Sequence, residues 1–400
     1  MNQARNDTRN HTRNRAVRWL ALSTFLAALL ALATPASAIE RNFAGSAQLD
    51  YMFVPTARSA KASPNTFDGF TMEFAGKLAV DFSDKISANM KVCYGCHGFE
   101  ADMMYFDLRV ADELNFRIGR FSPSFGAFNL RHDPANHRLS DKPLPYDMGR
   151  MLRMREWALG VLPSPFPDNG LEINGTKSLG ESVALDYAAY LVSGFKAGAN
   201  PTDIDFSLSH SPTAYYVDDN SRPTFGGRAS LTFKLGDTSD LTVGASTMYG
   251  TYDPTNSLAY LIVGGDATLR FDKLNIRAEY LGRRTEFATN RPNIFKYAVA
   301  PSNGDFFMKH GAYFEVEEGL TPELDLIGRI DGLFRVGNVE AASELDRRSS
   351  VFRYTLGTAY AIERGLRLKF STELWEFSDR DTLTGRKVEL SMHAAVAGSF

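Results

Sequence analysis

The only two cysteines of this 400-residue chain lie three positions apart, and a histidine directly follows the second one. Cys93, Cys96 and His97 form the order C-x-x-C-H, in which two thiols bind the vinyl groups of a haem and the imidazole binds its iron. A Cys93–Cys96 disulfide and a zinc site with one further ligand are the alternatives. Because the chain has only seven histidines, the position of His97 favours a covalently bound haem c.

The connection 122–168 carries further candidate iron ligands. His132, His137 and Met148 could each supply the sixth ligand, histidine giving a lower reduction potential and methionine a higher one. For each histidine, a hydrogen bond to a neighbouring loop residue is the alternative interpretation. No G-x-S-x-G or H-E-x-x-H motif occurs in the chain, so the sequence does not indicate an enzyme.

The first 38 residues have the pattern of an export signal. Five arginines precede an apolar run from Trp19 to Leu32, and Ala36-Ser37-Ala38 supplies a small-x-small cleavage site. We therefore predict a signal peptide at 1–38 and a mature chain at 39–400. The mature chain keeps 39 Lys and Arg against 46 Asp and Glu, a net charge of −7. A mildly acidic chain argues against nucleic acid as a partner.

The end of the chain alternates strictly between apolar and polar or small residues. One face of this segment carries Val388, Leu390, Met392, Ala394, Val396, Gly398 and Phe400. The same period of two recurs at 366–374, 352–360, 324–334 and 274–280. Segments of this kind, about 9 to 15 residues long, are typical of strands in outer-membrane β-barrels, where a C-terminal aromatic residue closes the last strand.

The connections between these segments alternate in length. Tight turns such as 83–84, 236–237 and 363–364 alternate with long connections such as 196–222, a pattern typical of periplasmic turns and extracellular loops. The count predicts an all-β, transmembrane antiparallel barrel of about 16 strands (14–18) in the lipid of the bacterial outer membrane. The longest connection, 122–168, contains apolar residues such as Phe125 and Phe128, so we expect it to fold into the lumen, with a solvent-exposed cap as the alternative.

One stretch resembles a known family. Arg117-Ile118-Gly119-Arg120-Phe121, followed by Pro123, Phe125-Gly126 and the long connection, is similar to the phosphate-selective porin O/P-like family of outer-membrane barrels. The resemblance implies passive transport of small, often anionic solutes. It does not carry over a ladder of basic residues, because the charges expected to face the lumen are mixed.

The predicted strands assign the charges to one face of the wall. The expected lumen cations are Lys91, Arg109, Arg277, Arg329 and Arg367. The expected lumen acids are Asp107, Glu279, Asp325, Asp331 and Glu373. The same alternation directs Cys93 into the barrel at the extracellular end of its strand. A preference for phosphate is therefore not indicated.

These observations predict electron transfer at the outer membrane through a porin-like barrel with one haem c. A wall about 25 Å high is more than one haem bridges, so periplasmic or surface cytochromes would have to pass electrons on. The alternative is a plain diffusion porin for small solutes, with a Cys93–Cys96 disulfide and no haem. A homotrimer is common among barrels of this size.

Overall fold

A computed structural model describes residues 40–55, 69–95, 98–147, 160–197, 203–210, 214, 216–287, 305–336, 350–377 and 387–400. The predicted signal peptide, 1–38, lies outside these residues. The chain divides into Met1–Glu40, of which only Glu40 is described, and one compact unit, Arg41–Phe400. Among the described residues, no helix is long and apolar enough to cross a membrane.

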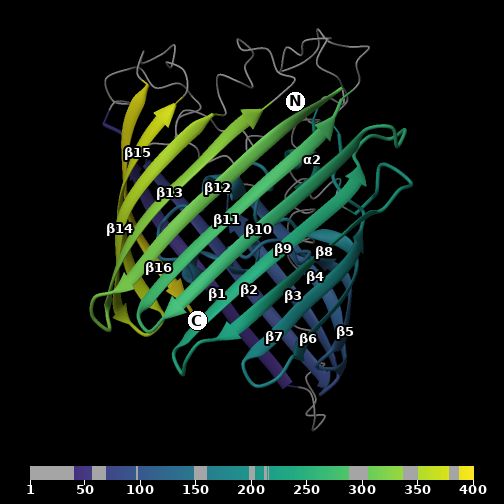
Figure 1. Ribbon diagram of the computed structural model, residues 1–400, viewed down its shortest axis with the longest axis horizontal. Helices are drawn as coiled ribbons and strands as arrows, with labels where there is room; N and C mark the ends of the chain where they lie inside the picture. The colour runs from purple at the N-terminus through teal and green to yellow at the C-terminus, as the bar shows by residue number, and fades with distance from the viewer. Residues whose placement is uncertain are drawn as a thin grey trace, which may run out of the picture. The chain divides into compact units, whose positions relative to one another are not determined.

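The compact unit is a closed antiparallel barrel (Figure 1) in which each strand pairs with its sequence neighbours and β1 pairs with β16. The strands are β1 (Glu40–Phe53), β2 (Gly69–Ser83), β3 (Ile86–Gly95), β4 (Gly98–Ala111), β5 (Leu114–Phe121), β6 (Asp168–Ser178), β7 (Val183–Val192), β8 (Thr224–Lys234), β9 (Ser239–Thr251), β10 (Ala259–Phe271), β11 (Leu274–Glu286), β12 (Phe306–Gly319), β13 (Leu324–Val336), β14 (Val351–Glu363), β15 (Leu366–Phe377) and β16 (Val388–Ser399). The predicted count of sixteen strands is confirmed.

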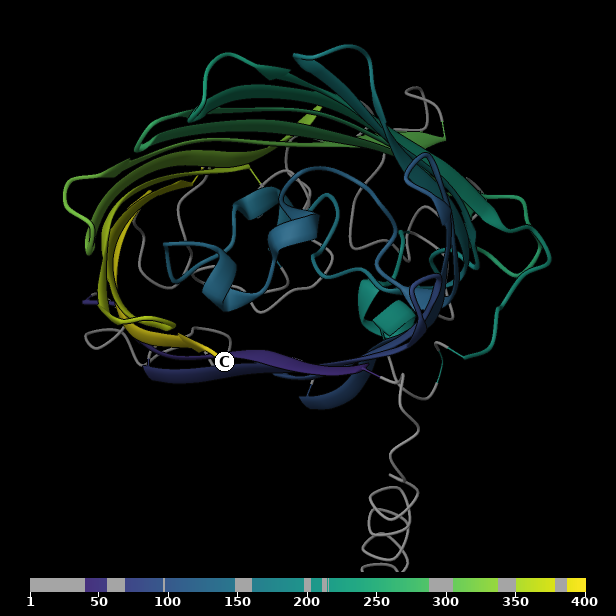
Figure 2. The ribbon, with the colours of Figure 1, turned by 90° about the horizontal axis from the view of Figure 1, so that it is seen from below.

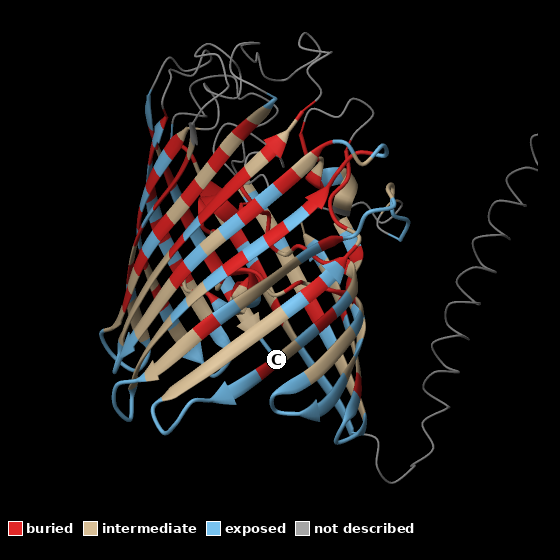
Figure 3. Cartoon of the chain, turned by 45° about the vertical axis from the view of Figure 1, so that its right-hand side comes forward, coloured by how far each residue is buried: buried red, intermediate tan, exposed pale blue. Residues whose placement is uncertain are grey.

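The walls of the barrel alternate between the two faces as the sequence predicted, and Figure 3 shows this alternation along the strands. On β14, the outward residues Phe352, Tyr354 and Leu356 are exposed, whereas Arg353 and Thr355 are buried inside. In a membrane this outer face meets lipid, and the closed sheet leaves no edge without backbone hydrogen bonds. The wall of the barrel is therefore apolar on its outer face and mostly polar on its inner face.

The C-terminal residue closes the seam between the first and last strands. The Gly45 amide donates to the Phe400 carbonyl at 2.9 Å, and the Phe400 amide donates back at 3.1 Å. The Phe400 ring lies over Gly45, where a Cβ would come within 2.4 Å of it. The ring also packs on Phe43 at 5.6 Å and on Phe74 at 6.4 Å. The predicted closing role of the terminal aromatic residue follows from these contacts.

Among the described residues, parts of two connections fold into the barrel, whereas the sequence predicted this of one. The lumen loop (122–167) carries the 3₁₀ helices η1 (Asn129–Arg131), η2 (Pro134–Asn136) and η3 (Leu144–Tyr146). The β7–β8 loop (193–223) carries the short helix α2 (Phe206–His210). Figure 2, viewed along the barrel, shows the helices of both loops inside the ring of strands. Of the connection predicted at 196–222, the described residues around Ile204 and Phe206 fold inward, whereas Tyr216 and Val217 stay exposed.

The apolar residues of the second loop explain that difference. Phe195, Ile204 and Phe206 are all 1 % exposed or less, and they join the same buried cluster as Phe125 and Phe128 of the lumen loop. Left outside the barrel, these side chains would expose their apolar area to water. Burying them in the lumen gives the interior its apolar core.

Replacing Phe400 with alanine should weaken the seam. Two aromatic contacts are lost, so we expect the free energy of unfolding to fall by about 1–3 kcal/mol. Urea unfolding in lipid vesicles measures this change. Phe271→Ala is the matched control, because Phe271 is equally exposed at 59 % but ends β10, away from the seam. Equal losses in both variants would contradict the closing role of Phe400.

Candidate functional site: the lumen and its two loops

Glu279, on β11, binds the backbone of the first turn of the lumen loop. Its carboxylate accepts the backbone amides of Ala127 at 2.9 Å and Phe128 at 3.2 Å. It also accepts the hydroxyls of Tyr146, from the loop, and Tyr313, from β12. The glutamate is 4 % exposed, so these four donors replace the water that it loses. The contact fixes how the loop enters the lumen.

A glycine makes this approach of the chain to Glu279 feasible. Gly126 adopts φ +65°, a conformation that residues with a side chain rarely adopt. A Cβ at this position would lie 2.0 Å from the Tyr146 hydroxyl and 2.2 Å from a Glu279 oxygen. The glycine of Phe125-Gly126, a pair in the stretch that resembles the porin O/P-like family, is thus required by the local geometry.

The middle of the loop is held by an arginine three strands further along the wall. Arg353, on β14, is fully buried and contacts Asp141 of the loop at 3.1 Å, Asp331 at 2.7 Å and Glu373 at 3.3 Å. It also donates to the carbonyl of Lys142 at 2.7 Å. One guanidinium therefore balances several buried carboxylates and ties the loop to β13, β14 and β15.

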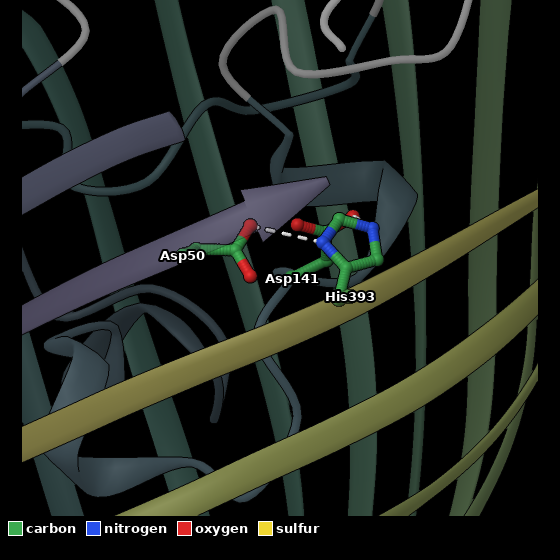
Figure 4. A group of neighbouring side chains, drawn as sticks. All are labelled: Asp50, Asp141 and His393. Atoms are coloured by element: carbon green, nitrogen blue, oxygen red, sulfur yellow. Dashed lines mark hydrogen bonds and ion pairs between the residues drawn. The ribbon is translucent and has the colours of Figure 1, made fainter. Parts of the chain in front are cut away.

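Beside this arginine, Asp50, Asp141 and His393 converge from β1, the lumen loop and β16, as Figure 4 shows. His393 Nδ1 lies 2.9 Å from Asp50, and its Nε2 lies 3.5 Å from Asp141 and 3.3 Å from Glu373. Carboxylates and an imidazole can bind a divalent cation. Here Arg353 already contacts Asp141 and Glu373, so its guanidinium supplies positive charge to the group. We interpret the group as an ion-pair network that anchors the loop.

Cys93 lies in the wall of an open pocket with about 720 Å³ of empty space between β2–β4 and the lumen loop. Its Sγ atom lies 3.4 Å from the Asp102 carboxylate. Lys91, one inward position away, contacts Asp102 at 2.9 Å and Asp133 of the loop at 2.8 Å. Lys91 also lies 2.7 Å from His132 Nε2. The predicted inward direction of Cys93 agrees with this geometry.

His132 lines the same pocket, but both of its ring nitrogens have partners. Nδ1 donates to the Asn129 carbonyl at 2.7 Å and Nε2 accepts from Lys91. Burial and the neighbouring Lys91 ammonium lower the pKa of His132 to about 4. The imidazole is therefore neutral at pH 7 and ties the loop to β3.

Of the remaining residues predicted to bind the haem or its iron, the structure describes only His137. His137 is buried, with Nδ1 2.8 Å from the Leu139 carbonyl, and burial lowers its pKa well below the usual value. Unlike His132, it does not line the pocket around Cys93. Cys96, His97 and Met148 lie outside the described residues. The haem attachment and its sixth ligand stay predictions.

The predicted lumen cations lie on the inner wall, and most of them contact carboxylates. Arg277 contacts Glu315 at 3.1 Å and Glu317 at 2.8 Å. Arg329 contacts Asp331 at 3.1 Å and is 2 % exposed. Two others are less enclosed: Arg109 is exposed near the short turns, and Arg367 is half-buried opposite Ala397. The inner wall thus presents mixed charge and no free basic ladder at Lys91, Arg277 or Arg329.

A polar crevice with about 1100 Å³ of empty space lies near the short-turn end of β5–β9. Arg117, Glu172, Asp186 and Arg228 line its wall, and Leu130 of the lumen loop borders it. Leu130 is 58 % exposed, an unusual state for a leucine inside a protein. The crevice is a space in the lumen that the described parts of the two loops leave open.

The sequence did not predict that Asp203, in the β7–β8 loop, forms ion pairs with the barrel wall. Asp203 lies between Arg283 and Lys309, which face each other on β11 and β12. The sequence carried one usable signal, because the apolar residues of 193–206 are of the same kind as those that placed the lumen loop inside. The partners of Asp203 could not be found from sequence, since they lie 80 and 106 residues away.

Comparisons with known proteins show the fold. No protein-family model matches the sequence, and no curated protein matches it. The chain is similar to the outer membrane channel DcaP of Acinetobacter baumannii, with a TM-score of 0.53, 10 % identity and coverage of 91 % of this chain and 98 % of that one. The chain is also similar to the anion-selective porin from Comamonas acidovorans, with a TM-score of 0.54 and 11 % identity. The match covers 90 % of this chain and 100 % of that one.

The trimer form of OmpT, an outer membrane protein of Vibrio cholerae, gives a TM-score of 0.53 at 8 % identity and covers 91 % of this chain and 100 % of that one. Together with the closed sixteen-strand sheet and its apolar outer face, these likenesses define the class. The chain has the porin fold of bacterial outer-membrane barrels.

Replacing Glu279 with glutamine should loosen the lumen loop. One oxygen becomes an NH2 group, which then faces either the Ala127 amide and the Tyr146 hydroxyl or the Phe128 amide and the Tyr313 hydroxyl. We therefore expect a loss of about 1–3 kcal/mol in loop anchoring. Trypsin cleavage after Arg131, followed by mass spectrometry of the folded barrel, should then be about tenfold faster or more.

The matched control is Glu286→Gln on the same strand, whose carboxylate contacts Arg284 at 2.6 Å and the Ala259 amide at 3.1 Å. It should leave the cleavage rate near that of the unchanged protein. If Glu279→Gln were cleaved no faster than this control, Glu279 would not be the anchor of the loop.

Proposed function

We propose that the protein is a porin-like channel through which small polar solutes diffuse passively across the bacterial outer membrane. The supporting observation is the combination of a closed barrel, apolar where it meets lipid, with a hydrophilic crevice left open beside the two inward loops. Water-filled barrels of this size carry solutes of limited dimensions, and inward loops set the limit. Small solutes are therefore the expected cargo.

The charge of the lumen favours weak selection between anions and cations. Arg117 contacts Asp107 at 2.9 Å, and Arg228 is paired with Asp266 in the wall of the same crevice. Because these cations are neutralised locally, they attract phosphate less than a ladder of unpaired lysines would. The sequence resemblance to phosphate-selective porins stays a prediction. A homotrimer is proposed by analogy with the trimer form of OmpT.

The second candidate function is electron transfer through a covalently bound haem c. One observation favours it: Cys93, the first cysteine of C-x-x-C-H, has its side chain in a lumen pocket that His132 also lines. Cys93 and Cys96 would hold the porphyrin and His97 its iron, and the haem would supply a one-electron redox centre. The exposed lining of the pocket is mainly apolar, but Lys91 and Asp133 bring buried charges to it, and a charged group is a less suitable neighbour for a porphyrin face than an apolar side chain. The diffusion channel is therefore the first choice.

Narrowing the crevice should lower the conductance. Leu130→Trp adds an indole at its border, so we expect the single-channel conductance in planar lipid bilayers to fall about twofold. The control Leu179→Trp places the same side chain in the turn after β6, where leucine is 50 % exposed. It should conduct as the unchanged protein does. A barrel that folds but passes no ion current would disprove the channel function.

The haem is tested by a peroxidase stain of the denatured polypeptide. A covalent haem stays with the chain, so a stained band at the mature mass is expected if electron transfer is correct, and Cys96→Ala should abolish or weaken it. His132→Ala is the control: it removes a proposed sixth ligand but neither thioether, so the band should remain. An unstained band would rule out the haem and leave the porin.

A further inference from the structure

The crevice beside β5–β9 contains an acid that forms no ion pair with any described residue. Asp186, on β7, lines the crevice, and its carboxylate accepts the Thr176 hydroxyl at 2.5 Å. By contrast, Glu172, another acid of the same wall, contacts Arg117 at 3.4 Å. A solute that enters the crevice therefore meets the Asp186 carboxylate without a competing cation from the wall.

An arginine on the neighbouring strand is directed away from this acid. Arg228, on β8, lies opposite Ala188, one inward position along β7 from Asp186. Both of its terminal nitrogens donate to Asp266 on β10, one of them at 2.8 Å. Gly244, on β9 between them, leaves the space for this crossing, because a Cβ there would come within 2.5 Å of Arg228 Nη2. Arg228 is thus paired with Asp266 and not with Asp186.

Small and hydroxyl-bearing residues surround the half-buried Asp186. Ala184 and Ala188 are the inward residues before and after it on β7. Thr176 on β6 and Ser230 on β8 are its direct cross-strand partners, and both line the crevice. Direct partners in an antiparallel sheet have Cβ atoms about 4.5–5.5 Å apart. One accessible carboxylate is therefore flanked by two hydroxyl groups on the same wall.

A carboxylate between two hydroxyls suits a primary ammonium group. An ammonium carries three N–H donors and one positive charge, and the carboxylate and both hydroxyl oxygens can accept its hydrogen bonds. Opposite unit charges about 4 Å apart in water attract each other enough to change an equilibrium about fivefold. An anion at the same place would be repelled by the carboxylate.

Other charges toward the short turns are mostly paired with each other. Arg270 Nε donates to Asp240 at 3.0 Å, and Lys234 lies 3.9 Å from Asp237. Arg109 is exposed near the same turns but does not line the crevice. Inside the crevice, the unpaired charge of the wall is therefore negative.

We propose that Asp186, with the hydroxyls of Thr176 and Ser230, binds the ammonium group of small organic cations in the crevice and gives the channel a preference for cations over anions. The proposal rests on the channel function and adds to it a class of solute. The preferred charge is the opposite of the one implied by the sequence resemblance to phosphate-selective porins.

The test measures the reversal potential across a gradient of ethanolammonium glycolate, a salt whose two ions are of similar size, with the full-length barrel in planar bilayers. The unchanged protein should pass ethanolammonium in preference to glycolate. Asp186→Asn keeps the size of the side chain but removes its charge, so the cation-to-anion permeability ratio should fall about fivefold. Asp84→Asn is the matched control, because it removes the same charge from an exposed position of the β2–β3 turn, and it should keep the ratio of the unchanged protein.

A second variant separates a binding site from a fixed charge. Ser230→Ala keeps Asp186 but removes one hydroxyl acceptor, so the preference for ethanolammonium over tetramethylammonium, which has no N–H donor, should fall about twofold. The ratio of potassium to chloride permeability should not change. Swelling of liposomes in ethylene glycol, a neutral probe of the same size as ethanolammonium, should be equally fast in all variants and shows that each barrel is folded and open.

The outcomes separate the two proposals. No current in the unchanged protein would disprove the channel, while calorimetric titration of ethanolammonium into the detergent-solubilised barrel and its Asp186→Asn variant would still test the site. Equal permeability ratios for Asp186→Asn and Asp84→Asn would overturn the site, because a general charge effect would then explain the selectivity. Faster passage of glycolate than of ethanolammonium through the unchanged protein would overturn the assignment to cations.

Discussion

Glu279 places a carboxylate on the inner wall where water does not reach it, and the lumen loop supplies most of its hydrogen bonds. Other buried charges of the wall also form hydrogen bonds with the lumen loop. Lys369, 1 % exposed, donates to Gln48 and to the carbonyls of Pro134 and Leu139. A buried charge without partners is costly, so wall and loop each require the other. The position of the loop follows from that requirement.

This requirement also shapes the part of the lumen left for transport. Where loop and wall satisfy each other, as around Arg353 and His393, the interior is closed by ion pairs. Where the loop presents Leu130 instead, a crevice remains beside the polar wall of β5–β9 among the described residues, and there the loop contacts Glu172 through the Ser124 amide. The same side chains that hold the fold therefore leave few unpaired charges to select a solute. The Asp203 contact differs, since a loop carboxylate meets two cations there.

The strands could be predicted because their signal is local. Each wall residue faces either lipid or lumen, so a period of two is imposed on β13, β14, β15 and β16 by the membrane itself. Alternating turn lengths then gave the count. The inward course of 122–167 was predictable from its apolar residues, and the same argument applied to 193–206 would have placed the second loop. The length of this second loop and its position in the chain did not indicate that it folds inward.

The C-x-x-C-H order is likewise a property of the sequence alone, and so is the direction of Cys93, which follows from the strand period. What surrounds that cysteine was decided by tertiary structure, because Asp133 and His132 reach Lys91 from a loop about forty residues further along the chain. Ion pairs such as Arg283–Asp203 or Arg353–Asp141 join positions 80 and 212 residues apart. Periodicity determines which face a side chain takes; only closure of the barrel around its loops decides which buried charge it meets.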